Sequence, residues 1–131
     1  MGVDYRIYPK ERAVVSHLRG RVTGRDILEY QARVWTDPAV AGFAELMDFS
    51  DASRADVSVE DIRELARRGH AIDAPVCSRM ALVAGSALAR TGMHIFKALR
   101  ESIPGGMREI RVFDDARDAR AWLGLPEGCG D

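Results

Sequence analysis

The stretch Ala44-Glu-Leu-Met-Asp-Phe-Ser-Asp-Ala-Ser-Arg-Ala-Asp-Val-Ser58 lies in the middle of the sequence and decides the class of fold that we predict. It begins as a short apolar strand, Leu46 to Phe49, changes into a run of Asp and Ser residues, and reaches a helix start at Ser58. A parallel strand of an α/β sheet delivers side chains to the rim of the sheet in this way, and ligands and partners usually dock at that rim. We therefore expect the functional site of the protein at the edge of the sheet that this stretch forms.

Strand patterns flank this stretch on both sides. Before it, the β-forming runs Val3–Tyr8 and Ala13–Leu18 are joined by four residues, which predicts an antiparallel hairpin. After it, strands are expected near Arg79–Ala84 and Glu109–Phe113. The central strand, 44–49, and the next one along the chain carry apolar residues in consecutive positions, so both of their faces should be covered.

Helix signals alternate with these strands. Thr23 and Asp26 have the spacing of a capping box, in which each side chain accepts a hydrogen bond from the other residue's backbone N–H. Ser58 and Asp61 repeat that spacing and open a second helix, which we expect to end at Gly69 with His70. Two more amphipathic helices are expected at about 87–102 and 116–123.

The order of elements is therefore β-β-α-β-α-β-α-β-α. Such alternation predicts parallel strands joined by right-handed helical crossovers. The predicted fold class is α/β: a single domain over residues 1–131, with a mainly parallel five-stranded sheet and an N-terminal antiparallel hairpin. Residues 125–131 are expected to form a flexible tail after the stop at Gly124 and Pro126.

Composition narrows the classes of function. The chain of 131 residues can bury a core, and its 47% hydrophobic and 30% charged residues are typical of a globular protein. The net charge of −1, from 19 basic and 20 acidic residues, is unlike that of a nucleic-acid binder. No apolar run approaches the ~18 residues of a membrane span. We expect a cytoplasmic protein that binds no nucleic acid and spans no membrane.

Motifs that carry chemistry are mostly missing from the sequence. There is no nucleophile elbow, phosphate loop or dinucleotide-binding glycine motif. Cys77 and Cys129 are far apart, with no second Cys or His at metal-ligand spacing, which favours a reduced setting. We expect no metal and no cofactor. An enzyme remains one alternative, and it would use Asp48 or Asp51 of the central stretch.

The element order and two segments resemble a known family. The segments are Glu45-Leu-Met-Asp-Phe-Ser50 in the central strand and Phe113-Asp-Asp-Ala-Arg-Asp-Ala-Arg-Ala-Trp-Leu123 at the end of the domain. Over residues 3–124 the chain resembles the SpoIIAA-like group. These are bacterial relatives of the STAS domain (sulphate transporter and anti-sigma-factor antagonist), similar also to lipid-binding CRAL-TRIO domains. The resemblance implies a small, non-catalytic switch or binding domain.

The resemblance also suggests a role for Ser58. In STAS antagonists, a serine or threonine that opens the helix after the central strand is phosphorylated by a partner kinase. Ser58 occupies that place, with Asp56 two residues before it. Those antagonists carry an Asp-Ser-Ser-Gly-like turn, whereas this chain has Ala55-Asp-Val-Ser-Val-Glu60 and a longer loop. A plain helix cap is the alternative role for Ser58.

The first functional hypothesis is a regulatory or protein-interaction domain. It would work through polar residues of the central stretch and of one neighbouring loop. We call them the serine–aspartate edge: Asp48, Ser50, Asp51, Ser53, Asp56, Ser58 and Ser86.

The second hypothesis is a binder of a lipid or other small apolar ligand, held between the sheet and the first and third helices. Its pocket would be lined by Trp35, Met93 and Phe96. We also expect a homodimer that buries an exposed sheet face or the flank of the third helix, because one small domain should not cover all of Tyr5, Tyr8 and Phe113.

Overall fold

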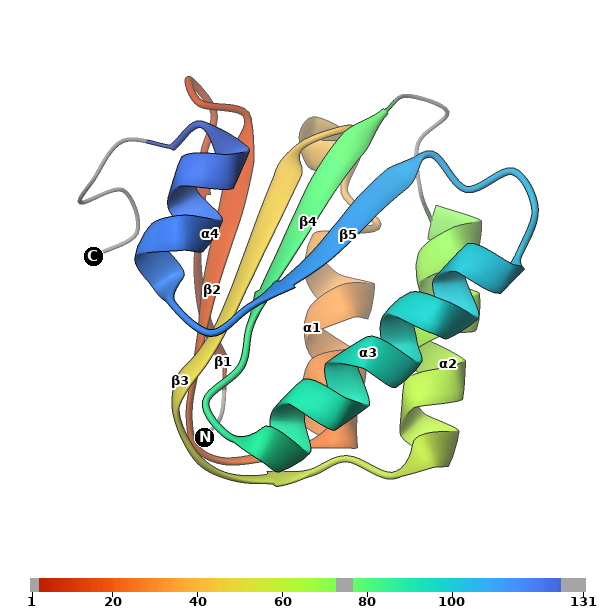
Figure 1. Cartoon of the computed structure of the whole chain (residues 1–131). Helices are drawn as coiled ribbons and strands as arrows, with labels where there is room; N and C mark the ends of the chain where they lie inside the picture. The colour runs from red at the N-terminus through yellow and green to blue at the C-terminus, as the bar shows by residue number, and fades with distance from the viewer. Residues whose placement is uncertain (1–2, 73–76, 126–131) are drawn as a thin grey trace.

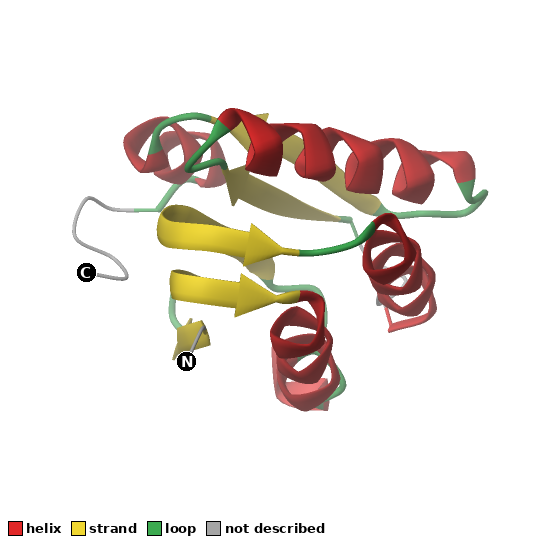
Figure 2. Ribbon diagram, turned by 90° about the horizontal axis from the view of Figure 1, so that it is seen from below, coloured by secondary structure: helices red, strands yellow, loops and turns green. Residues whose placement is uncertain are grey.

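A five-stranded sheet separates two layers of helices in the computed structural model, which describes residues 3–72 and 77–125 (Figures 1 and 2). The strands lie side by side in their order along the chain. β1 pairs with β2 antiparallel, and the other three pairings are parallel. The predicted α/β class, N-terminal hairpin and mainly parallel sheet are therefore confirmed. The strands are β1 (Val3–Tyr8), β2 (Ala13–Thr23), β3 (Ala44–Asp56), β4 (Ser78–Val83) and β5 (Arg108–Phe113).

Three helices cover one face of the sheet and one helix covers the other, as Figure 2 shows from below. The three are α1 (Gly24–Val34), α2 (Val59–Ile72) and α3 (Ala87–Ser102), and the single helix is α4 (Ala116–Leu123). A short 3-10 helix, Pro38–Val40, leads from α1 toward β3.

The sheet carries a larger core under α1, α2 and α3 and a smaller one under α4. Successive residues of β3 alternate between them: Leu46 joins the smaller core and Met47 the larger one. In β4, Ala81 and Leu82 do the same. This period of two explains why the middle strands are apolar at consecutive positions, and it confirms that both of their faces are covered.

β2 and β3 are longer than predicted. The Asp and Ser run after Phe49 continues as strand to Asp56, paired with residues 19–23 of β2, where we expected a loop. The pairing there is irregular, with register shifts around Gly20, whose φ of 63° suits glycine. Backbone pairing, rather than burial, holds this polar extension in place, so no apolar periodicity marks it in the sequence.

α2 also runs past its predicted end at Gly69 and His70, to Ile72. Gly69 is needed for the packing of α2 against α3, and it does not end the helix. A Cβ atom at position 69 would lie 2.5 Å from Nη1 of Arg100 on α3. Gly69 therefore leaves room for a guanidinium between two helices.

The predicted helix starts are present. Asp26 N–H donates to Thr23 Oγ1 at 3.1 Å, and Thr23 N–H donates to the Asp26 carboxylate at 2.9 Å. Ser58 and Asp61 form the same pair of bonds at the start of α2. At the other end of the domain, Leu125 begins the predicted tail and is buried in the smaller core. Residues 126–131 of that tail lie outside the described residues.

Candidate functional site

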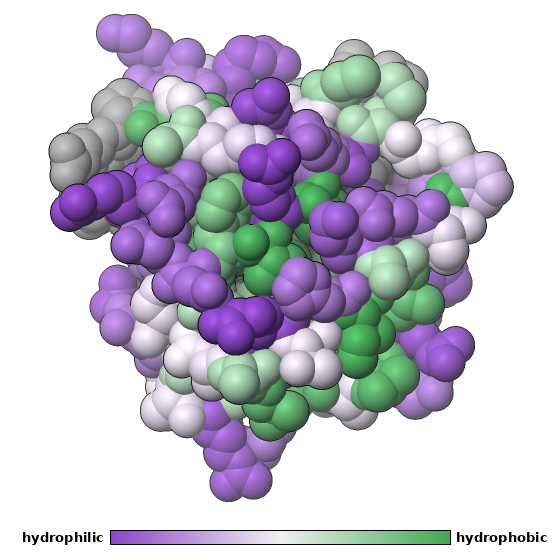
Figure 3. Space-filling model, in the orientation of Figure 1, coloured by the Kyte–Doolittle hydropathy of each residue, from purple (hydrophilic) through white to green (hydrophobic). Residues whose placement is uncertain are grey.

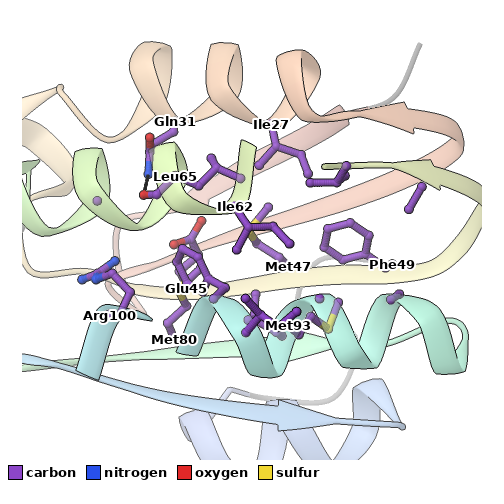
Figure 4. Close-up of a pocket in the computed structure, with 18 of the residues that line it drawn as sticks. Ile27, Gln31, Glu45, Met47, Phe49, Ile62, Leu65, Met80, Met93 and Arg100 are labelled. Atoms are coloured by element: carbon purple, nitrogen blue, oxygen red, sulfur yellow. Dashed lines mark hydrogen bonds between the residues drawn. The ribbon is translucent and has the colours of Figure 1, made fainter. Parts of the chain in front are cut away.

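A cavity of about 260 Å³ lies between the sheet and the three helices of the larger layer (Figure 4). Its wall is mostly apolar. Trp35, Met93 and Phe96, which the sequence suggested as pocket residues, all lie on this wall. The cavity thus joins side chains from α3 with the residue that follows α1.

One end of the cavity meets the surface where α2 and α3 begin. Val59 and Leu88 line the cavity there and are 50% and 77% exposed. Figure 3 shows apolar side chains gathering over α3 and toward α2 on this face. Between the helices, Gly92 lies on the wall, and a Cβ there would be 3.5 Å from Cδ1 of Ile62. The lack of a side chain at position 92 keeps this part of the cavity open.

A buried polar network closes part of the opposite end. The Tyr30 hydroxyl donates to Glu45 Oε2 at 2.7 Å and accepts from Trp35 Nε1 at 3.0 Å. Arg108 Nη2 donates to Glu45 Oε1 at 3.1 Å, and Arg108 Nη1 donates to Ser78 Oγ at 2.6 Å. The guanidinium carbon of Arg108 also lies 4.7 Å from the centre of the Trp35 ring. We call Tyr30, Trp35, Glu45 and Arg108 the Glu45 network.

Burial of the Glu45 network affects its protonation. The side chains of Arg108 and Glu45 are only 5% and 6% exposed, so they form a desolvated ion pair. Burial raises the pKa of Tyr30 well above its usual value, and the nearby Glu45 carboxylate raises it further. The tyrosine therefore stays protonated and acts as a donor to Glu45.

A second polar group lies at this end, where α1, α2 and α3 converge. It consists of Gln31, Gly69 and Arg100, which we call the Arg100 corner, and all three line the cavity. Gln31 Nε2 donates to the backbone oxygen of Leu65 at 3.0 Å, whereas its buried Oε1 has no hydrogen-bond partner within the described residues. Arg100 is 6% exposed, and its guanidinium carbon lies 5.8 Å from the centre of the Phe96 ring.

Two carboxylates of the serine–aspartate edge, Asp48 and Asp51, are engaged with neighbouring side chains. Asp48 is buried and accepts hydrogen bonds from the backbone N–H and the hydroxyl of Ser50, two residues along the same strand. Its other carboxylate oxygen lies 3.8 Å from Nδ1 of His17 on β2. Asp51 lies 3.9 Å from Arg19.

Three other residues of this edge, Asp56, Ser58 and Ser86, have structural roles. Asp56 binds Arg21 at 2.8 Å and Arg54 at 3.0 Å, and these two guanidinium groups lower the pKa of its carboxyl. Ser58 and Ser86 cap α2 and α3. Ser53, Asp56 and Ser86 line a second depression beside the end of β3. The residues described contain no group of three or more His, Cys, Asp or Glu that could hold a metal ion.

The sequence reasoning missed the polar residues of the cavity. Two signals could have found them. Glu45 precedes Met47 and Phe49 at a period of two, so it had to face the larger core. Arg100 follows Met93 and Phe96 at helical spacing and so extends the apolar stripe of α3. A charge at an inward position is unusual enough to mark a site.

Comparison with known proteins supports the fold. The chain is similar to an uncharacterised protein of the DUF3478 family from Shewanella loihica PV-4, whose crystal structure has a SpoIIAA-like fold. The two share 20% identity, the similarity covers 93% of each chain, and the TM-score is 0.56. No curated protein matches the chain in sequence.

Among the described residues, no helix combines the length and the apolar character that a membrane crossing requires. The SpoIIAA-like family model matches residues 13–124, which is most of the chain and takes in every element from β2 to α4. The chain therefore belongs to the SpoIIAA-like family.

Proposed function

We propose that this protein binds a small, largely apolar ligand in the cavity between its sheet and α1, α2 and α3. The cavity itself carries the proposal: about 260 Å³ of space, mostly apolar walls and an apolar rim at Val59 and Leu88. Ligand sites are typically concave and apolar with a few placed polar groups. The Glu45 network and the Arg100 corner supply such groups at one end.

The size of the cavity favours occupancy by a ligand. Protein interiors pack closely, and an unfilled apolar cavity destabilises the fold by about 24 cal/mol per Å³. A ligand that fills the space would recover much of that free energy.

An uncharged fluorescent dye, N-phenyl-1-naphthylamine, tests the proposal. We expect its emission to rise when it binds the parent protein. Gly92→Leu should place its side chain in the cavity and weaken dye binding by about tenfold or more, since one buried Leu fills much of the space. Ala98→Leu, on the exposed side of the same helix, is the matched control. Equal dye binding by both variants would mean that the cavity is not the site.

A second measurement asks whether the protein already carries a ligand. A native mass spectrum of freshly purified protein reports any bound small molecule together with the oligomeric state. We expect additional mass in the parent and less of it in Gly92→Leu.

We also propose that the domain is a non-catalytic regulatory module of the bacterial cytoplasm, as the family resemblance implies. The carboxylates of the serine–aspartate edge support this, because they are engaged in internal hydrogen bonds and ion pairs rather than converging on one point. Ser58 is exposed at a helix start, which is where STAS antagonists are phosphorylated. Its test is described below with the α2 cap.

A further inference from the structure

We propose that the protein forms a homodimer through β1, in which the β1 strands of two copies pair antiparallel around a two-fold axis at Tyr5. The two sheets would then join into one continuous sheet of ten strands, five from each copy. This inference is independent of the cavity. It gives the homodimer that we expect from the sequence a defined surface and a defined register.

The outer edge of β1 is open to another strand. β1 forms one end of the sheet (Figure 2), and within residues 3–72 and 77–125 it pairs with no strand except β2. A strand at the end of a sheet presents backbone N–H and C=O groups that a further strand can bind. Proteins often protect such a strand with a proline or a lysine, and β1 contains neither. The sequence of β1 therefore does not oppose pairing with a second strand.

The side chains of β1 leave apolar surface exposed. Tyr5 and Ile7 lie on the side of the sheet that carries α1, and the Tyr5 ring packs against Tyr30 with ring centres 5.9 Å apart. They nevertheless remain 38% and 40% exposed. Among the described strand residues, these two are the large apolar side chains that stay exposed. A second strand at this edge would cover them.

The charges of β1 select the register of the pair. Residues directly opposite each other in an antiparallel pair share a face, where opposite charges attract and like charges destabilise the pair. Asp4 and Arg6 are the two charged residues of β1, and both are exposed. With Tyr5 opposite the partner's Tyr5, Asp4 faces the partner's Arg6 and Arg6 faces the partner's Asp4. A register centred on Asp4 or on Arg6 would instead place like charges opposite each other.

The same register also matches the two faces of the joined sheet. Val3 packs against the larger core and Tyr8 against the smaller one, so odd and even positions of β1 lie on different faces. Centring on Tyr5 places Val3 opposite the partner's Ile7, which is an apolar pair on the face of the larger core. A slip by one position would pair residues of different faces. Charge and burial therefore favour one register.

A contact within each copy is compatible with this pairing. Asp4 Oδ2 lies 3.6 Å from Nε of Arg19 on β2, and the two side chains are 79% and 56% exposed. An ion pair that is this exposed contributes little to stability. A carboxylate can also accept hydrogen bonds from two guanidinium groups, so Asp4 can keep Arg19 and bind the partner's Arg6.

Charge reversal tests the register. Sedimentation of the parent at high micromolar concentration should show a dimer. Arg6→Asp should weaken the dimer by about tenfold or more, because two acidic side chains would then face each other on both sides of the axis. Asp4→Arg should weaken it in the same way. Arg111→Asp, at an exposed position of β5 at the other end of the sheet, is the matched control and should keep the dimer.

Two combinations of these variants test the pairing directly. The double variant Asp4→Arg/Arg6→Asp restores opposite charges and should dimerise as the parent does. An equal mixture of the two single variants should form a heterodimer that is tighter than either homodimer, because a strand with two basic residues then faces a strand with two acidic ones. The heterodimer also guards against loss of folding, since variants that do not fold could not pair.

Four results would overturn the proposal. These are a parent that stays monomeric, a dimer that Arg6→Asp leaves unchanged, a double variant as weak as the single variants, and a dimer that Arg111→Asp abolishes. The last result would place the interface at β5. The binding of the dye to the cavity is measured separately, so the failure of one proposal leaves the other to its own test.

Discussion

Glu45 places a carboxylate in the larger core, where it is 5% exposed. A buried charge is tolerated only when its hydrogen bonds and its charge are matched. Tyr30 and Arg108 provide these, one from α1 and one from β5. Tyr30, Glu45 and Arg108 therefore form a single unit, and removing one of them should leave the others with unmatched hydrogen bonds or charge.

The first prediction concerns the Tyr30 hydroxyl. Tyr30→Phe leaves Trp35 Nε1 and Glu45 Oε2 without this partner inside the core. We expect a loss of about 1–3 kcal/mol in the free energy of unfolding, the usual effect of an unsatisfied buried group. Urea denaturation measures it. Tyr8→Phe on β1 is the control and should change stability by much less.

The same tyrosine sets a dependence on pH. The pKa of Tyr30 is raised in the folded state. As the pH increases, folded Tyr30 therefore keeps its proton at pH values at which unfolded tyrosine, with a pKa of about 10, has begun to lose it. The contribution of protonated Tyr30 to the free energy of unfolding is complete below about pH 10, and it is lost as the pH rises toward the pKa of the folded state. The stability difference between the parent and Tyr30→Phe should therefore be constant below pH 10 and shrink above it.

The second prediction tests the ion pair. Arg108→Met leaves Glu45 charged in the core and should destabilise the protein by about 3–5 kcal/mol. Adding Glu45→Gln removes the charge and keeps an acceptor for Tyr30, so the double variant should be more stable than Arg108→Met alone. Denaturation midpoints of both variants decide this. A double variant less stable than Arg108→Met would show that the charge is not the cause.

At the scale of the elements, β3 serves two purposes. Its first half, up to Phe49, is a buried strand between two cores, and its second half is a polar extension paired only with β2. α2 then begins directly with the capping box of Ser58 and Asp61. The Ser58 hydroxyl thus acts as a cap of α2, whether or not a protein partner also recognises this residue.

The third prediction separates the two roles of Ser58. Ser58→Ala removes an acceptor and should lower stability by about 1 kcal/mol, whereas Ser58→Asp keeps a good cap and should leave the melting temperature nearly unchanged. Thermal unfolding measures both, with Ser86→Ala at the start of α3 as a comparable cap variant. If Ser58 is a switch, Ser58→Asp should also alter capture of a protein partner. Identical capture by the parent and both variants would leave Ser58 as a cap only.

At the scale of the whole molecule, β4 lies inside the sheet, between β3 and β5. The fourth prediction follows from its place. Leu82 is 4% exposed and belongs to the larger core, so Leu82→Ala should destabilise the protein by about 2–5 kcal/mol. Leu88→Ala, at an exposed position, should change stability by less than about 0.5 kcal/mol. A loss below about 1 kcal/mol for Leu82→Ala would contradict the central place of β4.

The fifth prediction concerns assembly. Phe113 packs against Trp122 with ring centres 5.6 Å apart, but Tyr5 and Ile7 on the end strand β1 stay 38% and 40% exposed. We expect a homodimer that covers these side chains. Sedimentation at high micromolar concentration should show a dimer in the parent and a monomer in Ile7→Lys. A parent that sediments only as a monomer would rule this out.

The sequence by itself determined the order of elements, the hairpin, the helix caps and the two-sided burial of the middle strands. Each of these depends on residues close together in the chain: a period of two or 3.6, a Thr-x-x-Asp spacing, or a glycine after a helix. The same local rules gave the wrong end for α2 and a loop where β3 continues. In both places the deciding contact is distant, with Arg100 beside Gly69 and β2 beside the polar run.

Only the tertiary structure decided the polar end of the cavity. Glu45 and Arg108 are 63 positions apart, and Gln31 and Leu65 are 34 apart, yet each pair is joined by a hydrogen bond. No local pattern encodes such meetings, because they depend on which helix covers which strand and on how far each helix is shifted along the sheet. The apolar residues of the cavity could be predicted from their spacing. The charged side chains on its wall became visible only when three helices and the sheet were placed around the same space.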